Sequence, residues 1–311
     1  MAPVLTDVNS TSTTPGPTGT GPDGGDPTVD PNRVGSAPVD GRASVAYAEY
    51  GDPDGAPAVF LHGTPGSRRL AALYDGEARA SGVRLLSIDR PGYGRSPPWP
   101  GRSLSAAGEF VAAVLDEAGV DRAGLIAFSG GGPQALAAAA TVGDRVDEVD
   151  VIGGAVPVEL AEGVATPVRA LRWLATRAPR LCGGLLRGQS WVAARAPPSV
   201  VLSQYSDDGA SGCTPRERTV VAEDFVEAFD GGAHGAVTEL AATASQWDVS
   251  VDAVERPVRL WHGTADTNVP IAGAERLGER IRNGTVERVA GADHLGTLVA
   301  VRSAVLGRQR R

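Results

Sequence analysis

A serine between a predicted strand and a predicted helix gives the strongest chemical signal in the sequence. In GLIAFSGGGPQA, residues 124–135, an apolar run leads into Ser129, and three glycines and an Ala-rich stretch follow. A serine is held exposed on so tight a turn only when the residues two before and two after it are very small. Here they are Ala127, in place of the usual glycine, and Gly131. We therefore predict that Ser129 is a nucleophile; the alternative is a Gly-rich turn with an incidental serine.

A serine hydroxyl becomes a good nucleophile when a neighbouring base takes its proton. In enzymes with this turn the acid and then the histidine follow the serine along the chain. Of the four histidines, His62 precedes the serine, His234 lies in a helical stretch and His262 precedes the best acid. His294, in GADHL, is therefore predicted to be the base.

The acid that orients the imidazole should lie on a loop after a strand, between the serine and the histidine. Asp266 meets this requirement in LWHGTADTNVP. Asp293 is poorly placed to bond the adjacent ring of His294 and is expected to be a loop or capping residue. Glu159, after an earlier strand, is a remote alternative.

Acyl transfer also needs two donors for the developing oxyanion. The backbone N–H of Gly130, directly after the serine, should be one. The loop HGTPG, residues 62–66, should supply the other, and Pro65 in it has no N–H. Thr64 is the predicted donor, with Gly63 as the fallback, and His62 is expected to brace the loop rather than to react.

These residues fall on a regular alternation of elements. Buried or alternating apolar runs predict strands at 44–50, 56–63, 83–89, 123–129, 146–154, 256–263 and 285–291. Helical spacing is found at 70–82, 103–119, 132–143, 272–284 and 294–307, with Ser103 or Ser105 expected to cap the second helix and Gly119 to end it. Such alternation predicts an α/β fold with a mostly parallel sheet covered on both faces.

Three regions are expected. Residues 1–38, rich in Thr, Pro, Gly and Asp, are predicted to be a disordered tail. Residues 39–156 and 254–311 form the core, and residues 157–253 form an inserted helical cap. The aromatic residues of the cap either form pocket walls or pack in its own core, and packing is favoured for each of them: Trp173, Trp191, Tyr205, Phe225 and Trp247.

The motifs HGTPGSR, DRPGYGRS, AFSGGGPQALA, HGTADTNVP and GADHL, in this order, resemble the α/β-hydrolase fold superfamily. They are most similar to its capped serine hydrolases, which include proline iminopeptidase-like enzymes and esterases. The resemblance covers about residues 43–160 and 254–307. It implies a catalytic triad of Ser129, Asp266 and His294, and a chiefly structural role for DRPGYGRS, with Tyr93 or Arg95 as substrate contacts a lesser alternative.

The predicted function is therefore a serine hydrolase that cleaves an ester or amide of a small molecule, most readily a carboxylic ester, through an acyl-enzyme. No cofactor or metal is implied. Cofactor-free haloperoxidases share the Ser-His-Asp set, so a side activity of that kind stays open. One alternative is an aminopeptidase whose cap holds the substrate ammonium with Glu223, Asp224 and Glu227, although charged helix faces are usually solvated. Another is a non-catalytic binding protein on the same fold.

Composition limits the partners and the compartment. The chain has 311 residues and a net charge of −8, which argues against a nucleic-acid partner. No apolar run reaches the roughly 18 residues of a membrane span, and no signal peptide is recognised, so a cytoplasmic location is expected. The oligomeric state stays open. Cys182 and Cys213 are expected to be buried thiols, with a disulfide between them as the alternative.

All 29 basic residues are arginine, and aspartate outnumbers glutamate. This composition favours a halophile whose acidic surface keeps it soluble at high salt. Codon bias in a mesophile with a GC-rich genome is the alternative.

Overall fold

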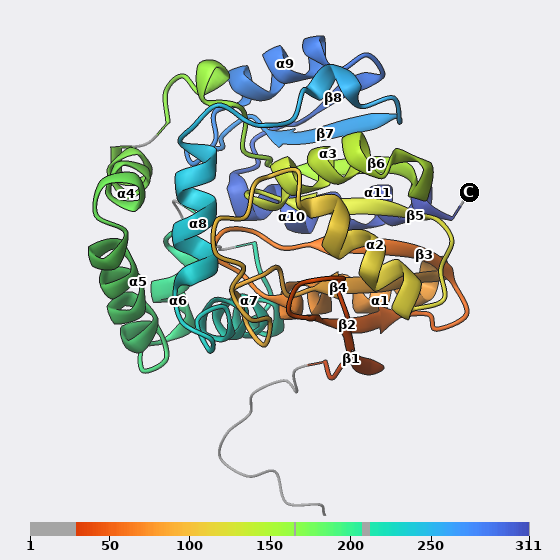
Figure 1. The fold of residues 1–311 in the computed structure, drawn as a ribbon, viewed down its shortest axis with the longest axis horizontal. Helices are drawn as coiled ribbons and strands as arrows, with labels where there is room; N and C mark the ends of the chain where they lie inside the picture. Colours follow the sequence, from red (N-terminus) through yellow and green to blue (C-terminus); the bar gives the residue numbers. More distant parts are fainter. Residues whose placement is uncertain (1–28, 165, 207–211, 311) are drawn as a thin grey trace, which may run out of the picture.

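The fold is described from a computed structural model, which covers residues 29–164, 166–206 and 212–310 (Figure 1). Eight strands form one sheet in the order β1-β2-β4-β3-β5-β6-β7-β8. The pairs β1–β2 and β2–β4 are antiparallel and all the others are parallel. The strands are β1 Arg33–Ala37, β2 Val45–Gly51, β3 Ala56–Leu61, β4 Val83–Ile88, β5 Ala123–Phe128, β6 Val146–Ile152, β7 Val258–Gly263 and β8 Gly284–Val289.

Helices cover both faces of the sheet, and strands β2 to β7 are mostly buried on both sides, whereas the edge strands β1 and β8 are more exposed. Along β3, Val59 and Leu61 belong to one apolar cluster, while Ala58 and Phe60 belong to the other. The first cluster includes side chains of α2 (Ala107–Glu117), α3 (Gly131–Thr141) and α9 (Ile271–Arg280). The second includes side chains of the 3-10 helix η1 (Arg68–Leu73) and of α1 (Asp75–Ser81), α10 (His294–Ala300) and α11 (Arg302–Gln309). Short 3-10 turns η2 Gly143–Arg145, η3 Val158–Leu160 and η4 Val251–Ala253 complete the connections.

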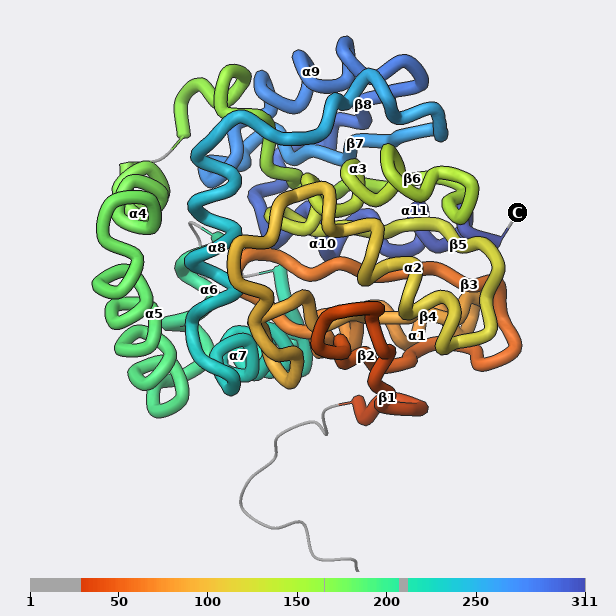
Figure 2. Tube along the Cα trace, in the orientation of Figure 1, coloured from red at the N-terminus to blue at the C-terminus, as the bar shows by residue number. Residues whose placement is uncertain are grey.

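The helices between β6 and β7, which we call the helical insertion, interrupt the alternation. They are α4 Thr166–Arg177, α5 Pro179–Ala193, α6 Pro198–Leu202, α7 Pro215–Glu227 and α8 His234–Thr243. In Figure 2 they lie together at one end of the sheet, with α4 and α5 outermost and α8 between them and the strands. The insertion therefore stands over the end of the sheet at which β5 leads into α3.

One sequence prediction differs from the structure at the N-terminal side. Residues 1–28 of the predicted tail lie outside the described residues, but Arg33–Ala37, expected in that tail, form strand β1. Backbone pairing with β2 stabilises this edge strand although its side chains are mostly exposed. Composition therefore missed it, because pairing along an edge does not need an apolar segment.

Two helices also differ from the sequence prediction. Neither Ser103 nor Ser105 caps α2, whose N-cap is Ala106 without a side-chain bond; Ser105 instead donates its hydroxyl to Asp248 at 2.7 Å. The final helix is divided at Val301 into α10 and α11. In the first case a partner distant in sequence competes for the hydroxyl, which the local pattern does not show.

Candidate active site

The turn at Ser129 has the geometry that the sequence predicted. Its φ is 51°, the only positive value at a non-glycine among the described residues. The turn is held because Ser129 N donates to Ile152 O at 2.9 Å and Gly132 N donates to Ser129 O at 3.0 Å. A Cβ added to Gly131 would lie 2.3 Å from Leu61 O, so α3 approaches β3 too closely for any side chain there. This packing keeps a serine in a backbone conformation that costs free energy.

The structure brings Ser129, His294 and Asp266 together from three distant segments. Ser129 Oγ is 2.9 Å from His294 Nε2, and His294 Nδ1 is 2.6 Å from Asp266 Oδ2. The three groups follow β5, begin α10 and follow β7, respectively. A base within reach of a hydroxyl, itself bonded to a buried carboxylate, is the arrangement that activates a serine.

Asp266 is held in its charged form. Burial alone would raise the pKa of this carboxyl, but the charge and hydrogen bond of His294, together with the backbone N–H of Val269 and the charge of His262, lower it below its usual range. The backbone N–H groups of Asn268 and Val269 each donate to Asp266 Oδ1 at 2.9 Å. Both carboxylate oxygens are thus engaged, which fixes the oxygen that faces the imidazole.

Two other histidines occupy structural positions nearby. His262 Nε2 is 2.7 Å from Val269 O and 3.6 Å from Asp266 Oδ2, and burial lowers its pKa. His62 is fully buried, its Nδ1 is 2.8 Å from Gly63 O, and burial together with the charge of Arg90 lowers its pKa well below the usual value. Both rings therefore bond to loop carbonyls on either side of Ser129.

The predicted oxyanion donors lie side by side. A Cβ added to Gly130 would lie 3.2 Å from Thr64 N and 2.2 Å from Thr64 Oγ1. A Cβ added to Gly63 would lie 3.6 Å from that of Ser129, so this fallback residue is also close to the serine. Thr64 and Gly130 line the same cavity as Ser129 and His294.

Behind the 62–66 loop lies a buried ion cluster that the sequence analysis missed. Glu239 of α8 accepts from Arg90 Nε and Nη2 at 2.8 and 2.7 Å, from Arg102 Nη2 at 2.8 Å and from Thr64 Oγ1 at 2.7 Å. Arg90 also donates to the carbonyls of His62 and Gly63. One carboxylate of the insertion therefore fixes the loop that presents Thr64.

The charges of its partners determine the state of Glu239. Burial would raise its pKa, but Arg90 and Arg102 hold it far below the usual range. Tyr93 donates its hydroxyl to the same carboxylate at 2.8 Å, so it is a structural residue and not a substrate contact. Arg95 contacts Asp89 through its backbone N at 3.0 Å, and neither Tyr93 nor Arg95 lines the cavity. Sequence spacing gave no signal of Glu239, because its partners are more than 130 residues away.

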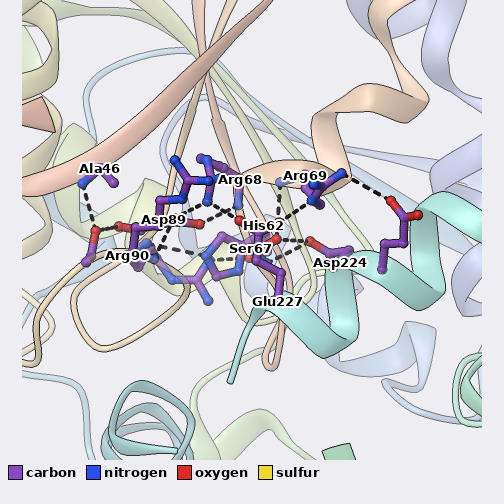
Figure 3. A network of polar contacts seen from close by, with 12 residues as sticks. Ala46, His62, Ser67, Arg68, Arg69, Asp89, Arg90, Asp224 and Glu227 are labelled. Atoms are coloured by element: carbon purple, nitrogen blue, oxygen red, sulfur yellow. Dashed lines mark hydrogen bonds and ion pairs between the residues drawn. The ribbon is translucent and has the colours of Figure 1, made fainter. Parts of the chain in front are cut away.

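A second network joins α7 to η1 (Figure 3). Asp224 accepts from Ser67 N and Oγ at 2.7 and 2.9 Å, and Arg68 pairs with both Asp89 and Glu227. Asp224 and Glu227 are buried, so the expectation of a solvated acidic face is wrong for them. They and Glu223, which pairs with Arg69 at 3.1 Å, do not line the cavity of Ser129.

The cavity over Ser129 has a volume of about 530 Å3. The core contributes Thr64, Gly130, Asn268 and His294 to it, and the helical insertion contributes most of the apolar wall. The apolar wall residues from the insertion are Pro167, Val168, Leu171, Leu186 and Leu240. A mostly apolar cavity with several polar groups in its lining suits a small organic molecule.

The other singled-out residues are placed as follows. Of the five aromatic residues only Tyr205 lines the cavity; Phe225 is buried against Phe229, Trp247 is half-buried against the core, and Trp173 and Trp191 are exposed.

Asp293 caps α10 by accepting from Gly296 N at 2.7 Å, and Glu159 pairs with Arg280 at the surface. Cys182 and Cys213 are both free and buried. No helix in the described part of the chain is long and apolar enough to cross a membrane.

Comparison with known proteins agrees with this architecture. The family model described as alpha/beta hydrolase fold matches residues 57–300, and the chain therefore belongs to that family. The predicted fold class is confirmed. A thermophilic esterase from Thermogutta terrifontis, solved with malate bound, has the same fold with a TM-score of 0.66 at 19% identity, over 90% of this chain and all of that one.

Curated relatives resemble the chain to different extents. A non-heme chloroperoxidase from Streptomyces lividans is 28% identical over 276 residues, which is 84% of this chain and 93% of that protein. A proline iminopeptidase from Xanthomonas citri is 32% identical over 120 residues, 37% of each chain. Apart from the chloroperoxidase, the curated relatives are matched over 39% of their length or less. Together these likenesses support a hydrolase without specifying its substrate.

Proposed function

We propose that the protein is a serine hydrolase that cleaves an ester bond of a small molecule through an acyl-enzyme. The observation that carries the proposal is the unbroken hydrogen-bond chain from Ser129 Oγ through the ring of His294 to Asp266, with distances of 2.9 and 2.6 Å. It supports the proposal because each member has the partner that its chemical role requires. The cavity that opens on Ser129 has room for a small substrate.

In the proposed mechanism Ser129 Oγ attacks the ester carbonyl while His294 Nε2 takes its proton. The N–H groups of Thr64 and Gly130 stabilise the tetrahedral oxyanion. His294 then returns the proton to the leaving alcohol, and a water molecule releases the acyl group by the same steps. Asp266 stays ionised throughout and stabilises the imidazolium.

We propose that residues 157–253 act as a cap that shapes the substrate cavity. Helices α4, α5 and α8 supply lining residues, which supports a role in substrate choice. An aminopeptidase is less well supported, because Glu223, Asp224 and Glu227 pair with arginines or backbone groups elsewhere. The identity with a proline iminopeptidase does not extend over most of either chain.

The first experiment is labelling with a fluorophosphonate probe at low and at multimolar salt. Wild type should be labelled, and Ser129→Ala should not be. Ser203→Ala is the matched control, because Ser203 lines the same cavity without contacting His294, and it should be labelled like wild type. Labelling that strengthens at high salt would favour the halophile interpretation of the composition.

Absence of labelling at both salt concentrations, in protein that unfolds cooperatively, would overturn the proposal. The binding-protein alternative would then be the better account. Labelling of the Ser129→Ala variant would show that another nucleophile reacts, and it would equally count against the mechanism.

A further inference from the structure

The cavity of Ser129 contains a cation, Arg172, that has no counter-ion among the described residues. Arg172 of α4 lines the cavity together with Ser129 and His294, and its side chain is half-buried. Its Nε is buried and has no hydrogen-bond partner, and no ion pair of this residue occurs among the described residues. Burial lowers the pKa of Arg172, and no neighbouring charge opposes that shift.

The fully buried arginines of the described chain are compensated, by contrast. Arg68 pairs with Asp89 and Glu227, and both Arg90 and Arg102 pair with Glu239. A desolvated guanidinium without such a partner costs free energy. A site that binds an anionic ligand accounts for this cost, because the ligand supplies the missing charge when it binds.

The rest of the cavity limits the anion to a small, singly charged group on an apolar chain. No Asp or Glu lines the cavity in the described part of the molecule, and Arg172 is its one permanently charged residue. Val168 and Leu171 of α4 and Leu186 of α5 form part of the apolar wall of the same cavity. One guanidinium balances one carboxylate, with two parallel hydrogen bonds, whereas a phosphate monoester would leave a second charge uncompensated.

We propose that Arg172 forms a carboxylate-binding subsite in the Ser129 cavity, so that the preferred substrates are small esters that carry a free carboxylate on an apolar chain. This inference rests on the proposed hydrolase function. Arg172 binds the carboxylate, and the ester carbonyl reaches Ser129 in the same cavity. Gln189, Gln204 and Asn268 add amide groups to the lining, and Gln189 Nε2 donates to Gln204 Oε1 at 2.7 Å.

The test compares acidic and neutral esters of matched length. The first series is the 4-nitrophenyl monoesters of adipate, pimelate and suberate, each beside the same ester with its free acid blocked as a methyl ester. The second series places the carboxylate on the alcohol side, as butyrate esters of hydroxy acids beside those of the hydroxy acid methyl esters. We expect kcat/KM to favour the acid about 10- to 100-fold at one chain length in at least one series, as charge-assisted hydrogen bonds to one carboxylate allow.

The variants identify the residue responsible. Arg172→Gln should abolish the preference, because it should lower kcat/KM for the acidic esters much more than for the neutral esters, which lack the charged contact. Arg172→Lys should retain part of the preference, because it keeps the charge but not the planar fork. Arg169→Gln, an exposed arginine one turn earlier on α4, is the matched control and should behave as wild type.

Failure of the subsite can be distinguished from failure of the hydrolase proposal. Fluorophosphonate labelling of Ser129 without any preference for acidic esters, or an equal loss for acidic and neutral esters in Arg172→Gln, would overturn the subsite alone. A binding measurement free of turnover completes the test. Monomethyl adipate should raise the Tm of Ser129→Ala more than that of Ser129→Ala/Arg172→Gln; equal shifts would contradict the proposal even if no hydrolysis were found.

Discussion

The two halves of the helical insertion differ in whether their charged side chains have partners among the described residues. The α7–α8 half inserts Asp224, Glu227 and Glu239 into the core, where backbone groups or arginines bind each carboxyl group. The α4–α5 half has no acidic residue, and none of its arginines takes part in an ion pair within the described chain: Arg169, Arg172, Arg177, Arg180 and Arg187. It also exposes Trp173 and Trp191, at 63% and 60%.

This difference suggests that the two halves of the insertion have different roles, one in holding the loop beside the serine and the other in lining the cavity. Glu239 bonds both Thr64 and the arginine that holds the preceding carbonyls, so the α7–α8 half fixes the loop beside the serine. The α4–α5 half contributes Val168, Leu171 and Arg172 to the cavity without any ion pair to the core. We therefore expect substitutions in the first half to alter stability and turnover, and those in the second to alter substrate choice.

The largest expected effect comes from Glu239→Gln. Removal of this charge leaves Arg90 and Arg102 buried without their shared counter-ion. The free energy of unfolding should fall by about 3–5 kcal/mol, as for other broken buried pairs. The kcat should fall roughly 10- to 100-fold because the position of Thr64 shifts. Urea denaturation and steady-state kinetics measure the two effects.

Glu223→Gln is the matched control for Glu239→Gln, because Glu223 lies in the same half but its pair with Arg69 is partly exposed to solvent. It should change stability by about 1 kcal/mol or less. Similar losses in the two variants would remove the distinction between a buried and an exposed carboxylate on which the comparison depends.

The next effect is a pH dependence in the α7–α8 half. Burial raises the pKa of Asp224 to about 8, although Ser67 donates to it. The native state therefore retains a proton on Asp224 that the unfolded chain releases near pH 4. Wild-type stability should fall as pH rises between about 5 and 8, by at most about 1.4 kcal/mol per pH unit from this group.

Asp224→Asn tests this origin, because an amide oxygen can still accept from Ser67 N and Oγ. Urea midpoints measured from pH 5 to 9 should decline less steeply in the variant than in wild type. Parallel curves would show that Asp224 is ionised in the native protein at neutral pH.

A smaller effect of opposite sign is expected in the α4–α5 half. Arg172→Met removes a partly desolvated charge that has no partner among the described residues, and it keeps an apolar stem in the cavity wall. Its free energy of unfolding should rise by about 0.5–1 kcal/mol, as is common when a functional residue is replaced by one that packs better. Thermal denaturation without ligand measures this, and a loss of more than 1 kcal/mol would show that Arg172 has a structural role.

The smallest effect is expected for Trp191→Gln. The ring is exposed and contacts Arg195, whose guanidinium carbon lies 4.2 Å from its centroid. Stability should change by no more than about 0.5 kcal/mol, as at other surface positions. Chemical denaturation beside wild type is sufficient, and a larger loss would place the ring in a packed interface.

Most of the site could be predicted because its residues lie at fixed places in a regular pattern. Ser129, Asp266 and His294 each adjoin a strand or helix whose apolar periodicity is clear, and the structure places them within hydrogen-bond distance of one another. Thr64 and Gly130 follow from the same logic, since they flank the ends of β3 and β5. Their catalytic roles stay predictions for the experiments above.

The residues that sequence reasoning missed act through contacts distant in sequence. Glu239 resembles any acid on a helix, and only tertiary packing brings it to Arg90 and Arg102. Arg172 is one of several arginines in its stretch, and no periodicity tells which of them faces a cavity. β1 was missed for a related reason, because an edge strand is stabilised by the backbone of its neighbour and not by its own composition.

The positive φ of Ser129 also bears on how this chain can change over generations. A glycine at that position would adopt the same turn without strain and would be more stable, but it would lack the hydroxyl. Retention of serine there is therefore opposed by the folding stability of the chain and depends on selection for its chemistry. In descendants released from that selection, Ser129 should be among the first residues of the site to be replaced.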